Sequence, residues 1–234
     1  MQLSERLEKL IGLAGSGETA ADIGTDHGMV PVELMRRGAF ARCIASDVRK
    51  GPLAAASVHV REAGLADKIE LRLGDGLKVL APGEADVILI SGMGGALMRR
   101  ILKEGEAAAK AASKLVLSPQ SEIPAFRAFL QKNGYRITAE AMVLEEGKFY
   151  VLMTAQPGEE TPWEGADLLY GKHLLEEGGG TLRAFLEHRI LVLGGICRDL
   201  ERSTGPKAER RRRETEEELA LAGKALKALP RADR

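Results

Sequence analysis

Carboxylates stand in or beside glycine turns at three places in the first third of the chain. Residues 21–28 read ADIGTDHG, so two aspartates and a histidine occupy a turn between an apolar run and an amphipathic one. Asp47 follows a second apolar run, and Asp75 stands between two glycines after a third. Glycine turns let a backbone approach a nucleotide closely, because glycine adopts conformations that other residues avoid. These residues indicate a site that is shaped for a nucleotide but lined with negative charge.

A pyrophosphate is a poor match for this first loop. Dinucleotide loops present bare backbone amides to two phosphates, whereas Asp22 and Asp26 would place carboxylates beside them. Like charges at such short range repel each other. A ligand that combines a nucleoside with an ammonium and a sulfonium is attracted instead, and S-adenosylmethionine carries all three. The loop residues predicted to bind this cofactor are Asp22, Gly24, Thr25, Asp26 and Gly28.

Each part of that cofactor has a candidate partner. Asp22 and Asp26 are expected to receive the methionine ammonium, directly or through water. Asp47 lies about twenty residues beyond the loop, where dinucleotide folds place the acid that binds the ribose hydroxyls. Asp75 is expected to accept a hydrogen bond from the adenine amino group, while Gly76 leaves room for the ring. The alternative for any single aspartate is a helix N-cap or a turn former, and Asp22 is also open to a structural role.

A second glycine-rich turn, SGMGG, follows a continuously apolar run. Consecutive glycines directly before a helix give access to a flat ring and expose helix N-terminal amides. Gly92, Met93 and Gly94 are therefore predicted to form the side from which a methyl acceptor approaches, with a purely steric glycine turn as the alternative. Further along, Gln120 and Ser121 are candidates either to reach the acceptor or to cap the next helix.

The elements that must position these residues alternate between short apolar runs and helical patterns. A helical repeat opens the chain, and strands are predicted at TAADIG, ARCIASD, KIELRLGDG, ADVILISG and SKLVLSP, with helices between them. Two more strands flank the turn at Glu146 and Gly147. This order predicts an α/β fold with a doubly wound, mostly parallel sheet and an antiparallel edge. Ligands of such sheets bind beyond the carboxyl ends of the strands.

The pattern changes near residue 158. Apolar residues at helical spacing continue to Leu200, STGP interrupts them at residues 203–206, and KAERRRRETEEELALAGKALKAL resumes them. This indicates a C-terminal helical hairpin of antiparallel coiled-coil type. We therefore expect two domains, with residues 1–157 binding the cofactor and residues 158–234 forming the helical appendage.

The overall charge gives no sign of nucleic acid, because 34 basic residues balance 34 acidic ones. Local basic clusters are nevertheless sufficient for RNA contact. The clusters are Arg36–Arg37, Arg99–Arg100 and Arg210–Arg213. The last of these is followed directly by glutamates, so ion pairs along a solvated helix are an equal alternative.

The remaining composition predicts an ordinary reduced, cytoplasmic protein. Cys43 and Cys197 are far apart and have no metal-ligand spacing, so no metal and no disulfide are expected. The opening MQLSERLEKLIGL carries charges that a signal peptide lacks. No apolar run approaches membrane-spanning length, so no membrane partner is expected either. We expect a monomer or a weak homodimer.

Five segments together resemble the TrmK-type bacterial tRNA adenine-N1 methyltransferases. They are ADIGTDHG, VRKGPL, LRLGDGL, SGMGGALMRRIL and EEGKFYVL. The resemblance extends over nearly the whole predicted sheet and the helical C-terminal part. It implies a Rossmann-like class I methyltransferase domain, a coiled coil used with tRNA, and methylation of N1 of the adenine at position 22 of a tRNA substrate.

The resemblance also implies roles for single residues. Asp22, Gly24, Asp26 and His27 would line the methionine end of the cofactor. From the chemistry of methyl transfer, Asp26 is expected to stabilise the cationic product or to take a proton from the exocyclic amine. His27 is expected to act as acid or base, to orient the loop or to serve only in packing. Two positions depart from the family, which usually has Glu at the position of Asp47 and Gln-Pro-Asn where Ser118–Gln120 stand. Three rival functions follow from the residues: a methyltransferase for another RNA or a small molecule, an NAD-linked oxidoreductase, and a non-catalytic RNA-binding scaffold.

Overall fold

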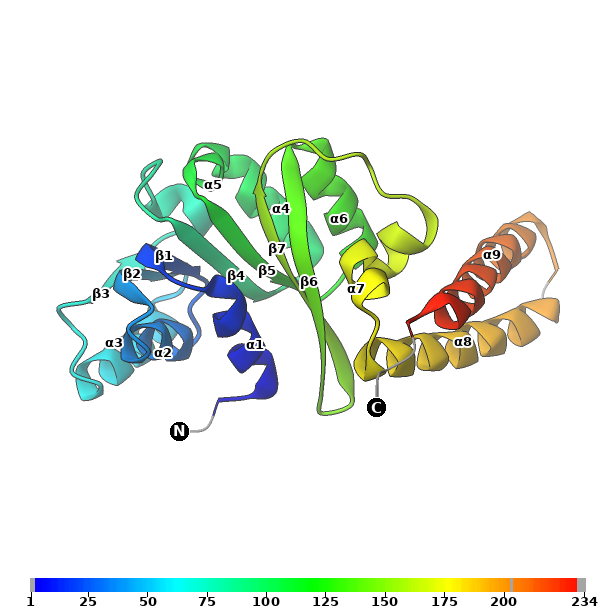
Figure 1. The fold of residues 1–234 in the computed structure, drawn as a ribbon, viewed down its shortest axis with the longest axis horizontal. Helices are drawn as coiled ribbons and strands as arrows, with labels where there is room; N and C mark the ends of the chain where they lie inside the picture. The colour runs from blue at the N-terminus through cyan, green and yellow to red at the C-terminus, as the bar shows by residue number, and fades with distance from the viewer. Residues whose placement is uncertain (1–2, 203, 231–234) are drawn as a thin grey trace. The chain divides into compact units, whose positions relative to one another are not determined.

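The computed structural model describes residues 3–202 and 204–230, which form two compact units, Met1–Pro162 and Trp163–Arg234. In the first unit a seven-stranded sheet has the order β3-β2-β1-β4-β5-β7-β6. Figure 1 shows α1, α2 and α3 together on one face of this sheet and α4, α5 and α6 on the other. The predicted doubly wound sheet is therefore confirmed. The strands are β1 (Gly17–Ile23), β2 (Phe40–Asp47), β3 (Ile69–Leu73), β4 (Val87–Met93), β5 (Lys114–Pro119), β6 (Tyr135–Glu145) and β7 (Lys148–Pro157).

The antiparallel edge is also confirmed, and its origin is local. The first five strands pair in parallel, whereas β7 runs antiparallel to both β5 and β6. Glu146 and Gly147 form the two-residue turn between the last strands, with φ of 49° and 74°. Two successive residues with positive φ match the twist of paired strands, so this turn closes a tight hairpin.

The longer helices of the first unit lie where the apolar periodicity predicts them. They are α1 (Glu5–Ala14), α2 (Met29–Arg36), α3 (Lys50–Glu62), α4 (Gly95–Glu104), α5 (Glu106–Ala111) and α6 (Ile123–Lys132), with a 3₁₀ turn at Gly76–Val79. Helix α5 and the 3₁₀ turn are too short for an apolar repeat, so the sequence does not predict them. Strand β4, predicted to be central, is buried from Val87 to Ile90 between β1 and β5.

Helix α1 is fixed to the sheet by both its apolar face and its ends. Leu7, Leu10, Ile11 and Ala14 are buried at the spacing of one helical stripe. At the C-terminal end, Lys114 of β5 donates from Nζ to the carbonyl oxygens of residues 13 and 14, at 3.3 and 3.1 Å. A cation at this position satisfies carbonyls that no helical amide reaches. The N-terminal turn of α1 is therefore held in a defined place above the sheet.

The second unit consists of helices, as predicted. A π-helical turn (Asp167–Gly171) leads into α7 (Lys172–Glu177), and the longer α8 (Gly180–Glu201) and α9 (Pro206–Ala228) pack against each other. Leu182, Leu186 and Leu193 of α8 are buried, and the buried positions of α9 are small. The predicted interruption at 203–206 lies between these helices, although residue 203 itself is outside the described residues. Among the described residues, no helix is long and apolar enough to cross a membrane.

Candidate active site

A cleft of about 680 Å³ opens at the carboxyl ends of β1 to β5. This is the edge at which open parallel sheets bind ligands. Most of the residues predicted from the sequence line it: Asp22, Gly24, Asp26, Asp47, Asp75, Gly76, Gly92 and Met93. Thr25, His27, Gly28 and Gly94 belong to the same turns but are not among the residues that line the cleft. The sheet therefore brings the three acidic turns together in one cavity.

Asp22 is the buried acid of this cleft. It lies near the end of β1, between Ala45 of β2 and Leu89 of β4, with a relative exposure of 4%. Burial raises the pKa of its carboxyl group from 3.8 to about 6, the Thr25 hydroxyl opposes part of this rise, and the charge of Asp47 adds to it. A cation that binds beside this buried carboxyl group would stabilise its charged form.

The loop after β1 is tied to the end of β2 by backbone hydrogen bonds. The amides of Gly24 and Thr25 both donate to the carbonyl oxygen of Ser46, each at 2.8 Å. Gly24 has a φ of 80°, and a Cβ at this position would come within 2.1 Å of the Met93 side chain. The turn is therefore shaped for glycine by its backbone, and the flexible end of the Met93 side chain lies close to it across the cleft.

Asp26 and His27 follow in the same loop and lie close together. Their side chains are 73% and 58% exposed, and His27 Nε2 lies 3.4 Å from Asp26 Oδ1. His27 has a φ of 58°, an uncommon conformation for a residue with a side chain. His59 of α3 supports it, since His59 Nδ1 lies 2.9 Å from the His27 carbonyl oxygen. The sequence favours a surface or packing role for His59, and its contact with the loop is visible only in the structure.

Gly28 ends the loop where α3 passes directly beneath it. Its φ is 70°, and a Cβ here would lie 3.0 Å from the Cβ and 3.2 Å from the Cα of Ala56. We expect Gly28→Ala to lower the free energy of unfolding by about 1–2 kcal/mol from the left-handed backbone alone, and further through this contact. Gly38→Ala is the matched control, because Gly38 has a φ of 63° and a Cβ added there would meet nothing within 4 Å. Urea unfolding of both variants measures the effect, and equal losses would contradict the packing contribution.

Asp47 is the last residue of β2, and one of its carboxylate oxygens already accepts a hydrogen bond. Its Oδ1 accepts a hydrogen bond of 2.7 Å from the Arg49 amide and lies 3.7 Å from Arg49 Nε. The side chain is 7% exposed, so the loop holds it in a defined orientation. A carboxylate fixed in this way can accept from the two hydroxyls of a vicinal diol. Val48, the next residue, lines the cleft with 63% exposure and provides an apolar surface for a flat ring.

Asp75 lies in a network of charges at the β3 side of the cleft. Arg100 Nη1 and Lys78 Nζ lie 3.3 and 3.5 Å from its Oδ2. The hydrogen bond from Arg100, together with the charges of Arg100 and Lys78, holds the pKa of Asp75 below its ordinary value. Asp75 therefore stays ionised and able to accept hydrogen bonds. Gly76, with a φ of 58°, also lines the cleft and lies against the Ile101 side chain.

The wall predicted to face the methyl acceptor is formed where β4 and β5 end together. The pairing of these strands is irregular between Ser91 and Met93, and the Gln120 amide donates to the Met93 carbonyl oxygen at 2.9 Å. Gln120 lines the cleft, whereas Ser121 caps α4 by accepting from the Gly95 amide through its carbonyl oxygen at 3.2 Å and its Oγ at 3.3 Å. The expected cap on the next helix is not formed, because α6 has no side-chain cap, and Ser121 caps the preceding helix α4 instead.

Several lining residues are not predicted from the sequence. Arg6 and Leu7 come from α1, and Arg49 and Arg100 are the other basic residues of the wall. Arg6 and Leu7 stand in a helical pattern that carries no sign of the site. Arg49 belongs to the VRKGPL segment, and the sequence presents Arg100 only as part of a basic cluster for RNA contact. Within the described part of the chain, no group of three or more His, Cys, Asp or Glu side chains is placed to hold a metal ion.

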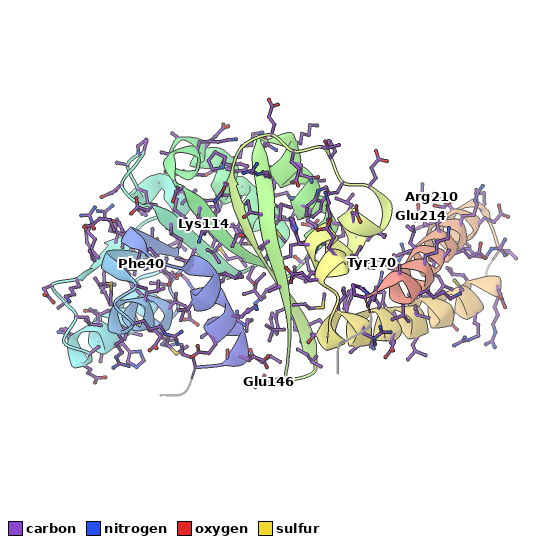
Figure 2. The ribbon with its side chains drawn as sticks, in the orientation of Figure 1. Phe40, Lys114, Glu146, Tyr170, Arg210 and Glu214 are labelled. Atoms are coloured by element: carbon purple, nitrogen blue, oxygen red, sulfur yellow. The ribbon has the colours of Figure 1, made fainter. Side chains whose placement is uncertain are left out.

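The arginine cluster of α9 is partly compensated by neighbouring glutamates. Arg210 and Arg211 lie 3.8 and 3.7 Å from Glu214, and Arg212 lies 3.7 Å from Glu216. Figure 2 shows Arg210 and Glu214 close together on the helix. These side chains are 44–72% exposed, and ion pairs of this kind contribute little to stability.

The sheet order and the acid-lined cleft together define a Rossmann-like methyltransferase. The family model described as "Methyltransferase domain" matches residues 3–153. The tRNA (adenine(22)-N(1))-methyltransferase of Bacillus subtilis is 34% identical over 182 residues, which cover 76% of each chain. The chain belongs to the TrmK family of tRNA (adenine(22)-N(1))-methyltransferases.

Solved structures agree over almost the full length. An uncharacterized protein from Listeria monocytogenes has a TM-score of 0.92 and 32% identity, and the match covers 96% of this chain and 100% of that one. A putative tRNA (m1A22) methyltransferase from Streptococcus pneumoniae, solved with S-adenosyl-L-methionine, has a TM-score of 0.87, 29% identity and the same coverage.

Proposed function

We propose that this protein transfers the methyl group of S-adenosylmethionine to N1 of adenine 22 in tRNA. The observation that carries the proposal is the acidic cleft at the carboxyl ends of the strands, found in a chain of the tRNA (adenine(22)-N(1))-methyltransferase family. The cofactor is S-adenosylmethionine, which the relative from Streptococcus pneumoniae binds. The cleft suits this cofactor, because the ammonium and sulfonium groups of the cofactor are positive and the aspartates that line the cleft are negative.

The cofactor-binding residues are assigned along the row of strand ends. Asp22, near the end of β1, and Asp26, in the loop after it, would receive the methionine ammonium, with Gly24, Thr25 and Gly28 shaping the turn. Asp47, after β2, would bind the ribose hydroxyls through its fixed carboxylate. Asp75 and Gly76, after β3, would face the adenine. When bound, the cofactor supplies an electrophilic methyl group.

The protein's part in the reaction is mainly alignment and electrostatics. Adenine N1 has an in-plane lone pair, so it needs correct placement more than activation. Gly92, Met93 and Gly94 would form the wall against which the acceptor ring lies. Methylation leaves a positive charge on that ring, and the exposed carboxylate of Asp26 would stabilise it. The target base would have to leave its stack to enter the cleft.

The two units are assigned different tasks. The first would hold the cofactor and the target base, because it contains the whole cleft. The helical second unit would contribute to tRNA binding, and the arginines of α9 that remain exposed are its candidate contacts. Since tRNA is the substrate, we place the protein in the cytoplasm.

Nucleoside mass spectrometry tests the function directly. Transcribed tRNA with adenine at position 22 is incubated with protein and S-adenosylmethionine, then digested and analysed. We expect N1-methyladenosine from this tRNA and none when position 22 is guanine. Methylation of small acceptors but not of tRNA would favour the rival methyltransferase, and calorimetric binding of NAD without S-adenosylmethionine would favour an oxidoreductase. RNA binding without any methylated product would favour a scaffold.

A further inference from the structure

Gln120 lies in the half of the cleft that is assigned to the methyl acceptor. It follows Pro119, the last residue of β5, and it is an exposed residue that lines the cleft. Because the strands run in the order β3-β2-β1-β4-β5, Gln120 is separated by β4 from the acidic turns of β1, β2 and β3. The residues assigned to the cofactor therefore leave this side chain without a task.

The backbone of Gln120 is fixed, while its side chain remains available. Its amide donates to the Met93 carbonyl oxygen at 2.9 Å, and Pro119 pairs with Met93 in the register of β4 and β5. Within residues 3–202 and 204–230, no residue forms a hydrogen bond with the Gln120 side chain. The carboxamide can therefore offer a carbonyl acceptor and two N–H donors to a ligand.

The end of β4, next to Gln120, leaves space for a flat ring. Gly92 has a φ of 76°, and a Cβ added there would meet nothing within 4 Å. Leu97 of α4 lines the same cleft and is 40% exposed, so it offers an apolar surface. Ligand pockets usually combine apolar surface with a few polar groups that fix the orientation of the ligand. Gln120 supplies such a group here.

The reaction determines which edge of the target adenine the protein can read. N1 must face the methyl group of the cofactor, so it cannot accept a hydrogen bond from the protein during the transfer. The N6 amino group and N7 remain on the neighbouring edge, as a donor beside an acceptor. A carboxamide pairs with these two atoms through two hydrogen bonds, as glutamine and asparagine do when they recognise adenine in nucleic acids.

The other polar side chains of the cleft fit this edge less well. Ionised aspartates can only accept hydrogen bonds, and arginines can only donate them. Ser46 and Ser91 also line the cleft, but a single hydroxyl cannot accept from N6 and donate to N7 in the plane of the ring. Among the described residues that line the cleft, Gln120 is the one with a carboxamide.

We infer that Gln120 reads the N6–N7 edge of the target adenine and determines the specificity for this base. Its carbonyl oxygen accepts from N6, and its amide group donates to N7. Guanine presents two acceptors at the same edge, O6 and N7, so the carbonyl oxygen of Gln120 would face another oxygen. The inference rests on the proposed function, in which the acceptor is an adenine of tRNA.

Single-atom changes in the target base test the inference. Ligated tRNA carries either 7-deazaadenosine at position 22, which lacks the N7 acceptor, or 3-deazaadenosine, which keeps N6 and N7. Both analogues have a more basic N1 than adenosine, so a lower rate with only one of them is not a loss of nucleophilicity. For the wild-type protein at pH 8 we expect kcat/KM to fall about tenfold with 7-deazaadenosine, as for one lost hydrogen bond, and not to fall with 3-deazaadenosine.

Gln120→Met keeps the length of the side chain and removes the carboxamide. Its kcat/KM for adenosine should be about tenfold below that of the wild type, and it should treat adenosine and 7-deazaadenosine alike. Its Kd for S-adenosylmethionine should not change. Ser121→Ala is the control for the turn, because Ser121 caps α4 from the next position and does not line the cleft. This variant should keep the wild-type preference for adenosine even if its melting temperature falls.

Three results would contradict the inference. A wild-type protein that methylates adenosine and 7-deazaadenosine equally would overturn it and leave the proposed function intact. A full preference retained in Gln120→Met would also overturn it, because another group would then contact N7. If the wild-type protein methylates no adenosine in tRNA, the proposed function fails, and the inference fails with it.

Discussion

Replacing Asp26 with Asn is expected to lower kcat for tRNA methylation about 100-fold, which is the usual size of a lost electrostatic contribution to a transition state. The substitution keeps the shape of the side chain and removes its charge. Since Asp26 is exposed at the mouth of the loop, the fold should tolerate the change. A positive charge develops on the adenine as the methyl group is transferred, so kcat should fall. The affinity for S-adenosylmethionine should fall as well, because Asp26 is assigned to the methionine ammonium, but it should fall less than kcat, because Asp22 shares that contact. Single-turnover assays with saturating tRNA measure the step itself.

Two companion variants separate Asp26 from its neighbour. Asp26→Glu keeps the charge and should retain more activity than Asp26→Asn. His27→Gln removes the partner that lies 3.4 Å from Asp26, and a small effect would assign His27 to shaping the loop. A kcat unchanged in Asp26→Asn would exclude Asp26 from the chemistry and leave it only a binding role. Equal losses in kcat and in cofactor affinity would also contradict the electrostatic role.

The positions of the acidic turns could be predicted because they depend on the sheet alone. Parallel strands end at one edge, so acids that follow successive strands must meet there. The continuous apolar run of β4 indicated a central strand for the same kind of reason, since both of its faces are covered. The antiparallel hairpin followed from Glu146 and Gly147, whose sequence fits a two-residue turn. In each case a local pattern determines a non-local arrangement.

The contribution of α1 could not be predicted in this way. Its apolar stripe predicts a helix but does not say which part of the sheet it covers. Arg6 meets Glu145 across 139 positions of sequence, and Lys114 joins the other end of the helix to β5. His59 likewise reaches the loop from a helix whose pattern signals only packing. Contacts of this kind depend on how the layers pack, and no periodicity in the sequence encodes them.

Asp22→Asn is expected to make the protein more stable at pH 8 and no more stable at pH 4. The pKa of Asp22 is about 6 in the fold and 3.8 ordinarily. The folded state therefore holds this proton more tightly, and its stability falls as pH rises from about 4 to about 6. Above this range the penalty is about 3 kcal/mol by the usual conversion of a pKa shift. Urea unfolding of both proteins at pH 4 and pH 8 measures the difference. A variant that is less stable at pH 8 would show that the ionised carboxylate has a structural role.

The same proton links cofactor binding to pH in the wild-type protein. A methionine ammonium interacts favourably with the ionised form of Asp22, so that binding should lower its pKa and release a proton near pH 6. We expect the affinity for S-adenosylmethionine to fall by up to about tenfold for each pH unit below 6, and to level off above it. Asp22→Asn should bind more weakly at pH 8 and lose this dependence, since its side chain does not titrate. Calorimetry between pH 5 and pH 8 in buffers of different ionisation enthalpy measures both the affinity and the proton release. A wild-type affinity that stays constant across pH 6 would show that Asp22 does not interact with the cofactor. If a bound cation stabilises the ionised form of Asp22, binding must change the number of protons that the protein takes up.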